Sequence, residues 1–308
     1  MSRRLLIFIW LPLLSTGLAS AHPGSGIAID DQGNVSFTDT GRGVWQIAQD
    51  GKATLISETA MHWMALDEQG AFADAPEQIG EWFGRLTPRG QKPTLLRCSD
   101  FPFTVGTDSN IYYAKMHGLT IMRRTPTGEE AAITGPEDFG FDDEHAVGVN
   151  GLACGPDGTL YLVMLDDLHQ SEASAEHWLW SVSQEGDVRL IAKNFIPERI
   201  PASERHHEAI PEYCRGLAVD NARNVYVAAT GSRGVVKVSP NGEAEVVMRC
   251  DKPWSPTGVA VADGAIYVLE YDDETPTEGR NWPPRVRKLT PEGDVSTLAT
   301  IQRNEDSP

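Results

Sequence analysis

A repeat that runs along the whole chain limits its possible folds more than any other feature. The template is a short apolar strand with small residues, a turn with Asp, Gly or Asn, and a second strand rich in β-branched and aromatic residues. The copies start at the position just before the small residue of each first strand, and these positions are Ser25, His62, Phe101, Asn150, Arg215 and Thr257. Six copies of one unit predict a repeat architecture.

Each copy is followed by a second hairpin, such as LWSVSQEGDVRLI or VVKVSPNGEAEVV. A polar pair ending in Gly between two alternating runs is typical of a β-hairpin. Each repeat is therefore predicted to be four antiparallel strands, which makes the chain all-β: a six-bladed β-propeller. The predicted blades cover about 25–58, 62–97, 101–134, 150–193, 215–249 and 257–300, within a domain spanning 22–303 and followed by a tail at 304–308.

The first residues have the features of an export signal. Arg3 and Arg4 precede an apolar run from Leu5 to Leu14, and Ala19-Ser20-Ala21 follows it. This pattern predicts a signal peptide, residues 1–21, removed before His22. The predicted location is therefore secreted or periplasmic, without membrane insertion. The formal net charge of −18 argues against nucleic acid or an anionic membrane as the partner.

The six repeat positions should converge at one end of the ring, on the face that also carries the insertions at 165–177, 194–213 and 271–284. Their variety favours a ligand site built from several strands over a purely structural repeat. A polar lining filled with water is the alternative. The candidate ligand-binding residues are thus Arg215, Asn150, His62, Thr257, Phe101 and Ser25.

The repeat resembles the NHL type, and NGLACGPDG and RGLAVDNARNVYVA resemble the senescence marker protein/gluconolactonase family of six-bladed propellers. The resemblance implies an axial divalent cation, calcium or zinc, held by a Glu, the Asn of an NGL motif and an Asp, which activates a lactone for hydrolysis. Asn150 matches the Asn, but Ser25 stands at the Glu position and Arg215 at the Asp position. A guanidinium repels a cation where a carboxylate would attract it.

Arg215 instead suits a carboxylate, a sulfate or a sugar acid, because a guanidinium donates two parallel hydrogen bonds. A structural salt bridge to Glu212 or Glu270 is the alternative. Aromatic residues such as Trp254 and Trp82 lie near loop ends and could stack on a sugar or peptide. Acidic residues of the same loops, such as Asp142 and Asp272, are expected to form a solvent-exposed rim.

Histidines offer a different metal site. His22 would be the new N-terminus, and His62 and His207 map to the same face. An imidazole set can hold copper or catalytic zinc. The candidate metal ligands are therefore Asn150, His22, His62 and His207, and solvated histidines are the alternative.

The four cysteines allow three pairings. Cys98 and Cys250 lie in blades on opposite sides of the ring, so they cannot pair. A bridge, if one forms, is expected between Cys214 and Cys250, and Cys154 is expected in the core.

The sequence thus predicts an exported propeller that binds a small anionic or sugar-like ligand, or a peptide, at one end of the ring. The alternative is a metal-dependent lactone or ester hydrolase with an altered ligand set. The sequence does not identify catalytic residues, and it leaves the oligomeric state open.

Overall fold

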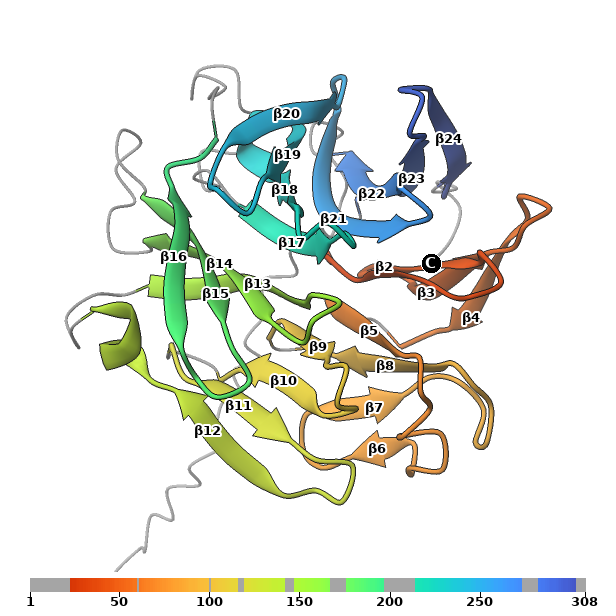
Figure 1. Ribbon diagram of the computed structural model, residues 1–308. Coiled ribbons are helices and arrows are strands. Elements are labelled where there is room, and N and C mark those ends of the chain that lie inside the picture. The colour runs from red at the N-terminus through yellow and green to blue at the C-terminus, as the bar shows by residue number, and fades with distance from the viewer. Residues whose placement is uncertain are drawn as a thin grey trace, which may run out of the picture.

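The fold is a ring of six antiparallel sheets that follow one another in chain order, as Figure 1 shows. The structure is a computed structural model, and it describes residues 23–59, 61–99, 101–115, 119–141, 147–166, 176–196, 214–272 and 282–302. The predicted fold class, an all-β six-bladed propeller with four strands per blade, is confirmed. The predicted signal peptide and C-terminal tail lie outside the described residues.

Blades 1 to 3 occupy the first half of the chain. Their strands are β1 (Ile27–Ile29), β2 (Val35–Asp39), β3 (Gly43–Ile47), β4 (Ala53–Ser57), β5 (Trp63–Asp67), β6 (Gln78–Ile79), β7 (Phe83–Arg85), β8 (Thr94–Cys98), β9 (Phe103–Val105), β10 (Ile111–Ala114), β11 (Ile121–Arg124) and β12 (Glu130–Thr134). A short 3-10 helix, η1 (Pro136–Phe139), follows blade 3.

Blades 4 to 6 occupy the second half. Their strands are β13 (Val147–Cys154), β14 (Leu160–Asp166), β15 (His177–Val182), β16 (Val188–Lys193), β17 (Cys214–Val219), β18 (Val225–Ala229), β19 (Gly234–Val238), β20 (Ala244–Arg249), β21 (Trp254–Ala262), β22 (Ala265–Asp272), β23 (Pro284–Leu289) and β24 (Val295–Thr300). The 3-10 turn η3 (Thr230–Ser232) joins β18 and β19. Across the described residues, no helix has the length and apolar character needed to span a membrane.

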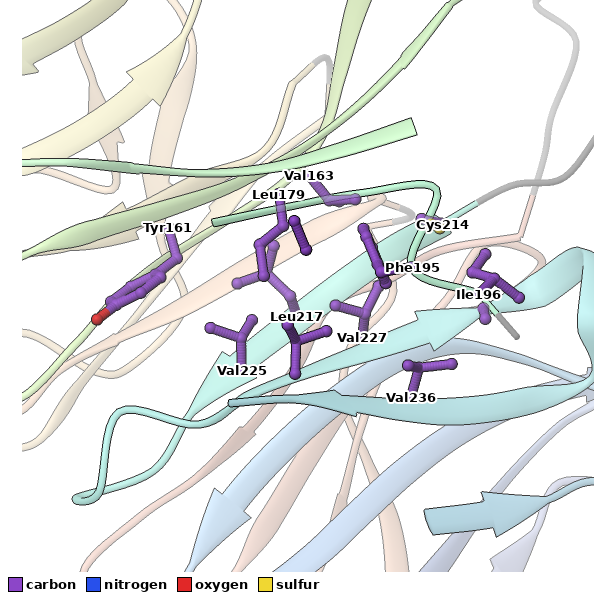
Figure 2. Close-up of a cluster of buried hydrophobic side chains, with 13 residues drawn as sticks. Tyr161, Val163, Leu179, Phe195, Ile196, Cys214, Leu217, Val225, Val227 and Val236 are labelled. Atoms are coloured by element: carbon purple, nitrogen blue, oxygen red, sulfur yellow. The ribbon is translucent and has the colours of Figure 1, made fainter. Parts of the chain in front are cut away.

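The blades are held together by apolar side chains between neighbouring sheets, and each of the six interfaces contains one buried cluster. Figure 2 shows the cluster between blades 4 and 5, in which Val163 and Leu179 of blade 4 face Leu217 and Val227 of blade 5. Alternation along each strand places these side chains on the faces that neighbouring blades cover. The innermost strands are thereby fixed next to one another around the axis.

Blade 2 departs from the predicted hairpin order. Its sheet order is β5-β8-β7-β6, so β5 pairs with the last strand of the blade and not with the next segment of the chain. The segment expected as a second strand, Ala71–Asp74, forms a turn. The buried Asp67 carboxylate accepts the N–H groups of Gly70 at 2.9 Å and Phe72 at 2.7 Å. This turn directs Phe72 into the core.

The ring closes without a strand shared between its first and last blades, since β1 to β4 form one sheet and β21 to β24 another. Strand β1 packs against β21 instead. The hydroxyl of Tyr271 in blade 6 donates a 2.6 Å hydrogen bond to the carbonyl of Thr38 in blade 1. Closure therefore depends on packing and on individual hydrogen bonds across this interface.

Candidate ligand site at one end of the ring

Three of the six predicted site positions share one backbone feature. The pairing of the innermost strand with its neighbour shifts register between Val149 and Gly151 in blade 4, between Cys214 and Leu217 in blade 5, and between Pro256 and Gly258 in blade 6. Asn150, Arg215 and Thr257 lie inside these β-bulges. A bulge leaves its extra residue out of the ladder and reorients its side chain.

These three bulges lie side by side at the same end of the ring. A Cβ added at Gly151 would lie 2.5 Å from the carbonyl oxygen of Arg215, and one added at Gly216 would lie 3.0 Å from that of Thr257. A Cβ at Gly258 would collide with the carbonyl oxygen of Ser25. Glycine follows each bulged residue because the next innermost strand leaves no room for a side chain. We call this end of the ring, bounded by Ser25, His62, Asn150, Arg215 and Thr257, the mouth.

Arg215 contacts the start of the described chain. Its Nη1 donates a hydrogen bond to the carbonyl oxygen of Pro23, and the guanidinium is half-buried. The next carbonyl, that of Gly24, accepts a 2.7 Å hydrogen bond from the hydroxyl of Thr257. Thr257 is only 1% exposed. Two successive carbonyls of the N-terminal segment are therefore bound by two neighbouring blades.

His62 binds the same segment through its backbone. Its carbonyl oxygen accepts the N–H groups of Ser25 at 2.8 Å and of Gly26 at 2.9 Å. Its ring Nδ1 lies 2.7 Å from the carbonyl oxygen of Ser99. Because a carbonyl only accepts, Nδ1 is the protonated nitrogen of this ring.

The other two predicted site residues are buried. The Ser25 side chain is 4% exposed, and its hydroxyl has no hydrogen-bond partner. Phe101 is also 4% exposed and stacks on Tyr113 with ring centroids 5.1 Å apart. Its other aromatic neighbours are Trp82 and Phe83. The structure thus places Phe101 in the core between blades 2 and 3.

Asn150 is half-buried, and none of the hydrogen bonds between described residues involves its side chain. An amide in this position can both donate to and accept from a ligand. The mouth therefore combines the cation of Arg215 with the amide of Asn150 on adjacent strands.

The salt bridge considered between Arg215 and Glu270 is not formed. Glu270 is fully buried and pairs with two arginines of β23: Oε2 lies 2.5 Å from Arg285 Nε, and Oε1 lies 2.6 Å from Arg287 Nη2. Arg285 also lies over the ring of Trp254, 4.2 Å from its centroid. The alternative partner Glu212 lies outside the described residues.

The expected disulfide between Cys214 and Cys250 is wrong. No disulfide joins the four cysteines, all of which are described. Cys214 begins the innermost strand of blade 5 and Cys250 follows the outermost one, about three strand spacings or roughly 14 Å away, which exceeds the reach of a disulfide. The Cys250 thiol instead donates to Glu270 Oε1 at 3.2 Å. Burial, and then the Glu270 carboxylate, raise the pKa of this thiol well above its usual value.

The residues at the mouth do not fit the cation that the family resemblance implies. Ser25 presents a buried hydroxyl, and Arg215 brings a positive charge. Among the described residues, no group of three or more His, Cys, Asp or Glu side chains could hold a metal ion. The candidate metal ligands His22 and His207, and the rim acid Asp142, lie outside the described residues.

Comparison with solved structures finds similar chains at low sequence identity. A gluconolactonase from Xanthomonas campestris matches with a TM-score of 0.50 and 16% identity over 79% of this chain and 82% of its own. Virginiamycin B lyase from Staphylococcus aureus matches with a TM-score of 0.49 and 15% identity, over 92% and 85% of the two chains. The calcium-binding protein regucalcin from Agrobacterium tumefaciens gives 0.45 and 14%, over 90% and 73%.

No family model matches the chain, and no curated protein matches it. The chain is a six-bladed propeller, and with the match to the gluconolactonase structure the predicted resemblance is confirmed at the level of the fold. At these sequence identities, structural similarity does not assign the activity of any of these proteins to this chain. Sequence reasoning missed the N-terminal segment that Arg215 and Thr257 hold. The small residues of Pro23-Gly24-Ser25-Gly26 are the signal for that close packing.

Proposed function

We propose that this propeller binds a small carboxylate ligand, a sugar acid in the first instance, at the mouth, and that Arg215 is its main anchor. The observation that carries the proposal is the pair of adjacent bulges that present Arg215 and Asn150. The guanidinium pairs with a carboxylate, and the amide of Asn150 hydrogen-bonds a neighbouring hydroxyl. Export of the chain, as its first residues predict, would expose this site to ligands outside the cytoplasm.

Rigid support favours a specific site. Both side chains stand on innermost strands fixed by buried clusters on either side. A site on such strands needs little reorganisation when a ligand binds, so little of the binding free energy is lost to ordering.

Calorimetric titration with D-gluconate, D-glucuronate, acetate and sulfate tests the proposal. Arg215→Gln removes the charge, and the expected loss for a charge-assisted hydrogen bond is about 1.5–3 kcal/mol, or roughly 10- to 100-fold in affinity. Arg189→Gln is the matched control, because Arg189 is an exposed residue of the outermost strand of blade 4. Equal affinities in both variants would refute the role of Arg215.

Asn150→Ala isolates the second contact. Because the Asn150 side chain has no hydrogen bond within the described chain, stability should stay within about 0.5 kcal/mol. Affinity for the sugar acids should fall about two- to tenfold, whereas affinity for acetate, which carries no hydroxyl, should not change. A parallel loss for acetate would contradict the assignment of Asn150 to a hydroxyl.

A metal-dependent lactone or ester hydrolase is the alternative. What supports it is the NGL sequence with Asn150 in a bulge at the mouth. What opposes it is the guanidinium of Arg215 next to that amide. Elemental analysis of the purified chain distinguishes the two: stoichiometric calcium or zinc, lost together with lactonase activity in Asn150→Ala, would replace the binding proposal.

A further inference from the structure

The four residues Pro23–Gly26, here called the N-terminal strap, hold the mouth from within the same chain. The strap accepts hydrogen bonds at Pro23 from Arg215 and at Gly24 from Thr257, and it donates two from Ser25 and Gly26 to the His62 carbonyl. These partners belong to blades 5, 6 and 2. The strap therefore bridges the ring at the point where its ends meet.

Part of the strap competes directly for the proposed anchor. The Pro23 carbonyl is a neutral acceptor. It accepts a hydrogen bond from the Arg215 guanidinium, which is the group that we propose binds the carboxylate of the ligand. A carboxylate binds a guanidinium more strongly than a carbonyl does, since it adds a negative charge and accepts two parallel N–H bonds at once. An anion in reach of Arg215 can therefore displace Pro23.

The docked strap also carries a cost. The Ser25 hydroxyl is buried without a hydrogen-bond partner. A buried polar group without a partner lowers the equilibrium constant for docking by roughly tenfold or more. The docked state is thus opposed at Ser25, while six hydrogen bonds to described residues support it: the four above and two from Thr38 of blade 1 to the Gly26 carbonyl.

We propose that the N-terminal strap is an autoinhibitory element that occupies Arg215 and is released when an anionic ligand binds. The inference rests on the proposed function. The sequence predicts Thr257 as a ligand-binding residue. In this inference its hydroxyl does not contact the ligand but holds the strap in place through its hydrogen bond to the Gly24 carbonyl. Loss of the Thr257 hydroxyl should therefore strengthen ligand binding.

Two variants of the full chain weaken the strap without altering Arg215. Thr257→Val leaves the buried Gly24 carbonyl without its donor. Gly24→Ala places a Cβ against the hydroxyl and Cβ of Thr38. Each should tighten D-gluconate binding about tenfold in a calorimetric titration. Thr297→Val, on the exposed outer strand of the same blade, should change nothing.

The possible results separate this inference from the proposed function. Unchanged affinity in both strap variants would overturn the autoinhibitory role while leaving the anion site intact. Weaker binding in Thr257→Val together with unchanged binding in Gly24→Ala would make Thr257 a ligand contact and would also overturn it.

Hydrogen exchange tests the strap independently of any ligand. The amides of Ser25 and Gly26 should be protected in the wild-type chain and should exchange at least tenfold faster in both strap variants. If D-gluconate binds to no variant but these amides behave as expected, the proposed function fails and the docked strap stands. If the wild-type amides exchange as fast as in an unfolded peptide, the strap is not docked and the inference fails.

Discussion

Replacing Gly151 with alanine tests how closely the innermost strands of blades 4 and 5 approach each other. The new Cβ would lie 2.5 Å from the Arg215 carbonyl oxygen, 3.0 Å from Val163 Cγ1 and 3.2 Å from Leu217 Cδ2. Ordinary contact begins at about 3.4 Å, so the strands must separate by about 0.9 Å, the difference between 3.4 Å and 2.5 Å. The first contact is with backbone, which cannot rotate away.

The cost of such overpacking is about 1–3 kcal/mol. Alanine also lowers the conformational entropy of the unfolded chain, which stabilises the fold by about 0.4–1 kcal/mol, so the middle of the two ranges gives a net destabilisation of about 1.3 kcal/mol. Urea denaturation followed by tryptophan fluorescence measures the change. Gly135→Ala is the matched control, since a Cβ there meets only the flexible Glu137 carboxylate. Equal stability of Gly151→Ala and the wild type would refute the close approach of the strands at the mouth.

Three further predictions follow from buried polar groups. Glu270→Gln leaves Arg285 and Arg287 without their buried carboxylate, so the free energy of unfolding should fall by about 3–5 kcal/mol; a loss below about 1 kcal/mol in urea denaturation would contradict the pairing. Burial, with a smaller contribution from Asp220, raises the pKa of Tyr226 to about 12. A raised pKa stabilises the fold fully below the unfolded value of about 10, and this contribution is lost as pH rises to 12. The ultraviolet titration of the native chain should therefore lose a step near pH 12 in Tyr226→Phe, and a lost step near pH 10 would refute the shift. The Cys250 thiol should resist iodoacetamide at pH 8 until the chain unfolds, because burial raises its pKa and only the thiolate reacts; labelling of native Cys250 in a peptide map would contradict this.

The sequence predicts the ring well because each blade repeats the same local chemistry. Asp30 and Asp220 illustrate this: each carboxylate accepts two turn N–H groups, from Gln32 and Asn34 in blade 1 and from Ala222 and Asn224 in blade 5. Such short-range turns set strand boundaries without help from distant residues. The strand order of blade 2 was not predicted. There the Asp67 carboxylate also accepts turn N–H groups, but the turn places Phe72 in the core and does not lead into a second strand.

The mouth could be predicted only in part. Repeat symmetry brings Asn150, Arg215 and Thr257 to the same end, and the structure adds that all three are bulged. What each side chain touches depends on segments far apart in sequence, such as Pro23 and Arg215. The same holds for Cys250, which meets Glu270 of the next blade and not Cys214 of its own. A repeat pattern gives no information on these contacts.

A crystal structure of the chain with saturating D-gluconate tests the central claim most directly. We expect a carboxylate about 2.7–2.9 Å from the guanidinium of Arg215, with the Pro23 carbonyl moved away from it. A ligand bound elsewhere would contradict the claim, and one bound to Arg215 while Arg215 still donates to Pro23 would overturn only the autoinhibitory role of the strap.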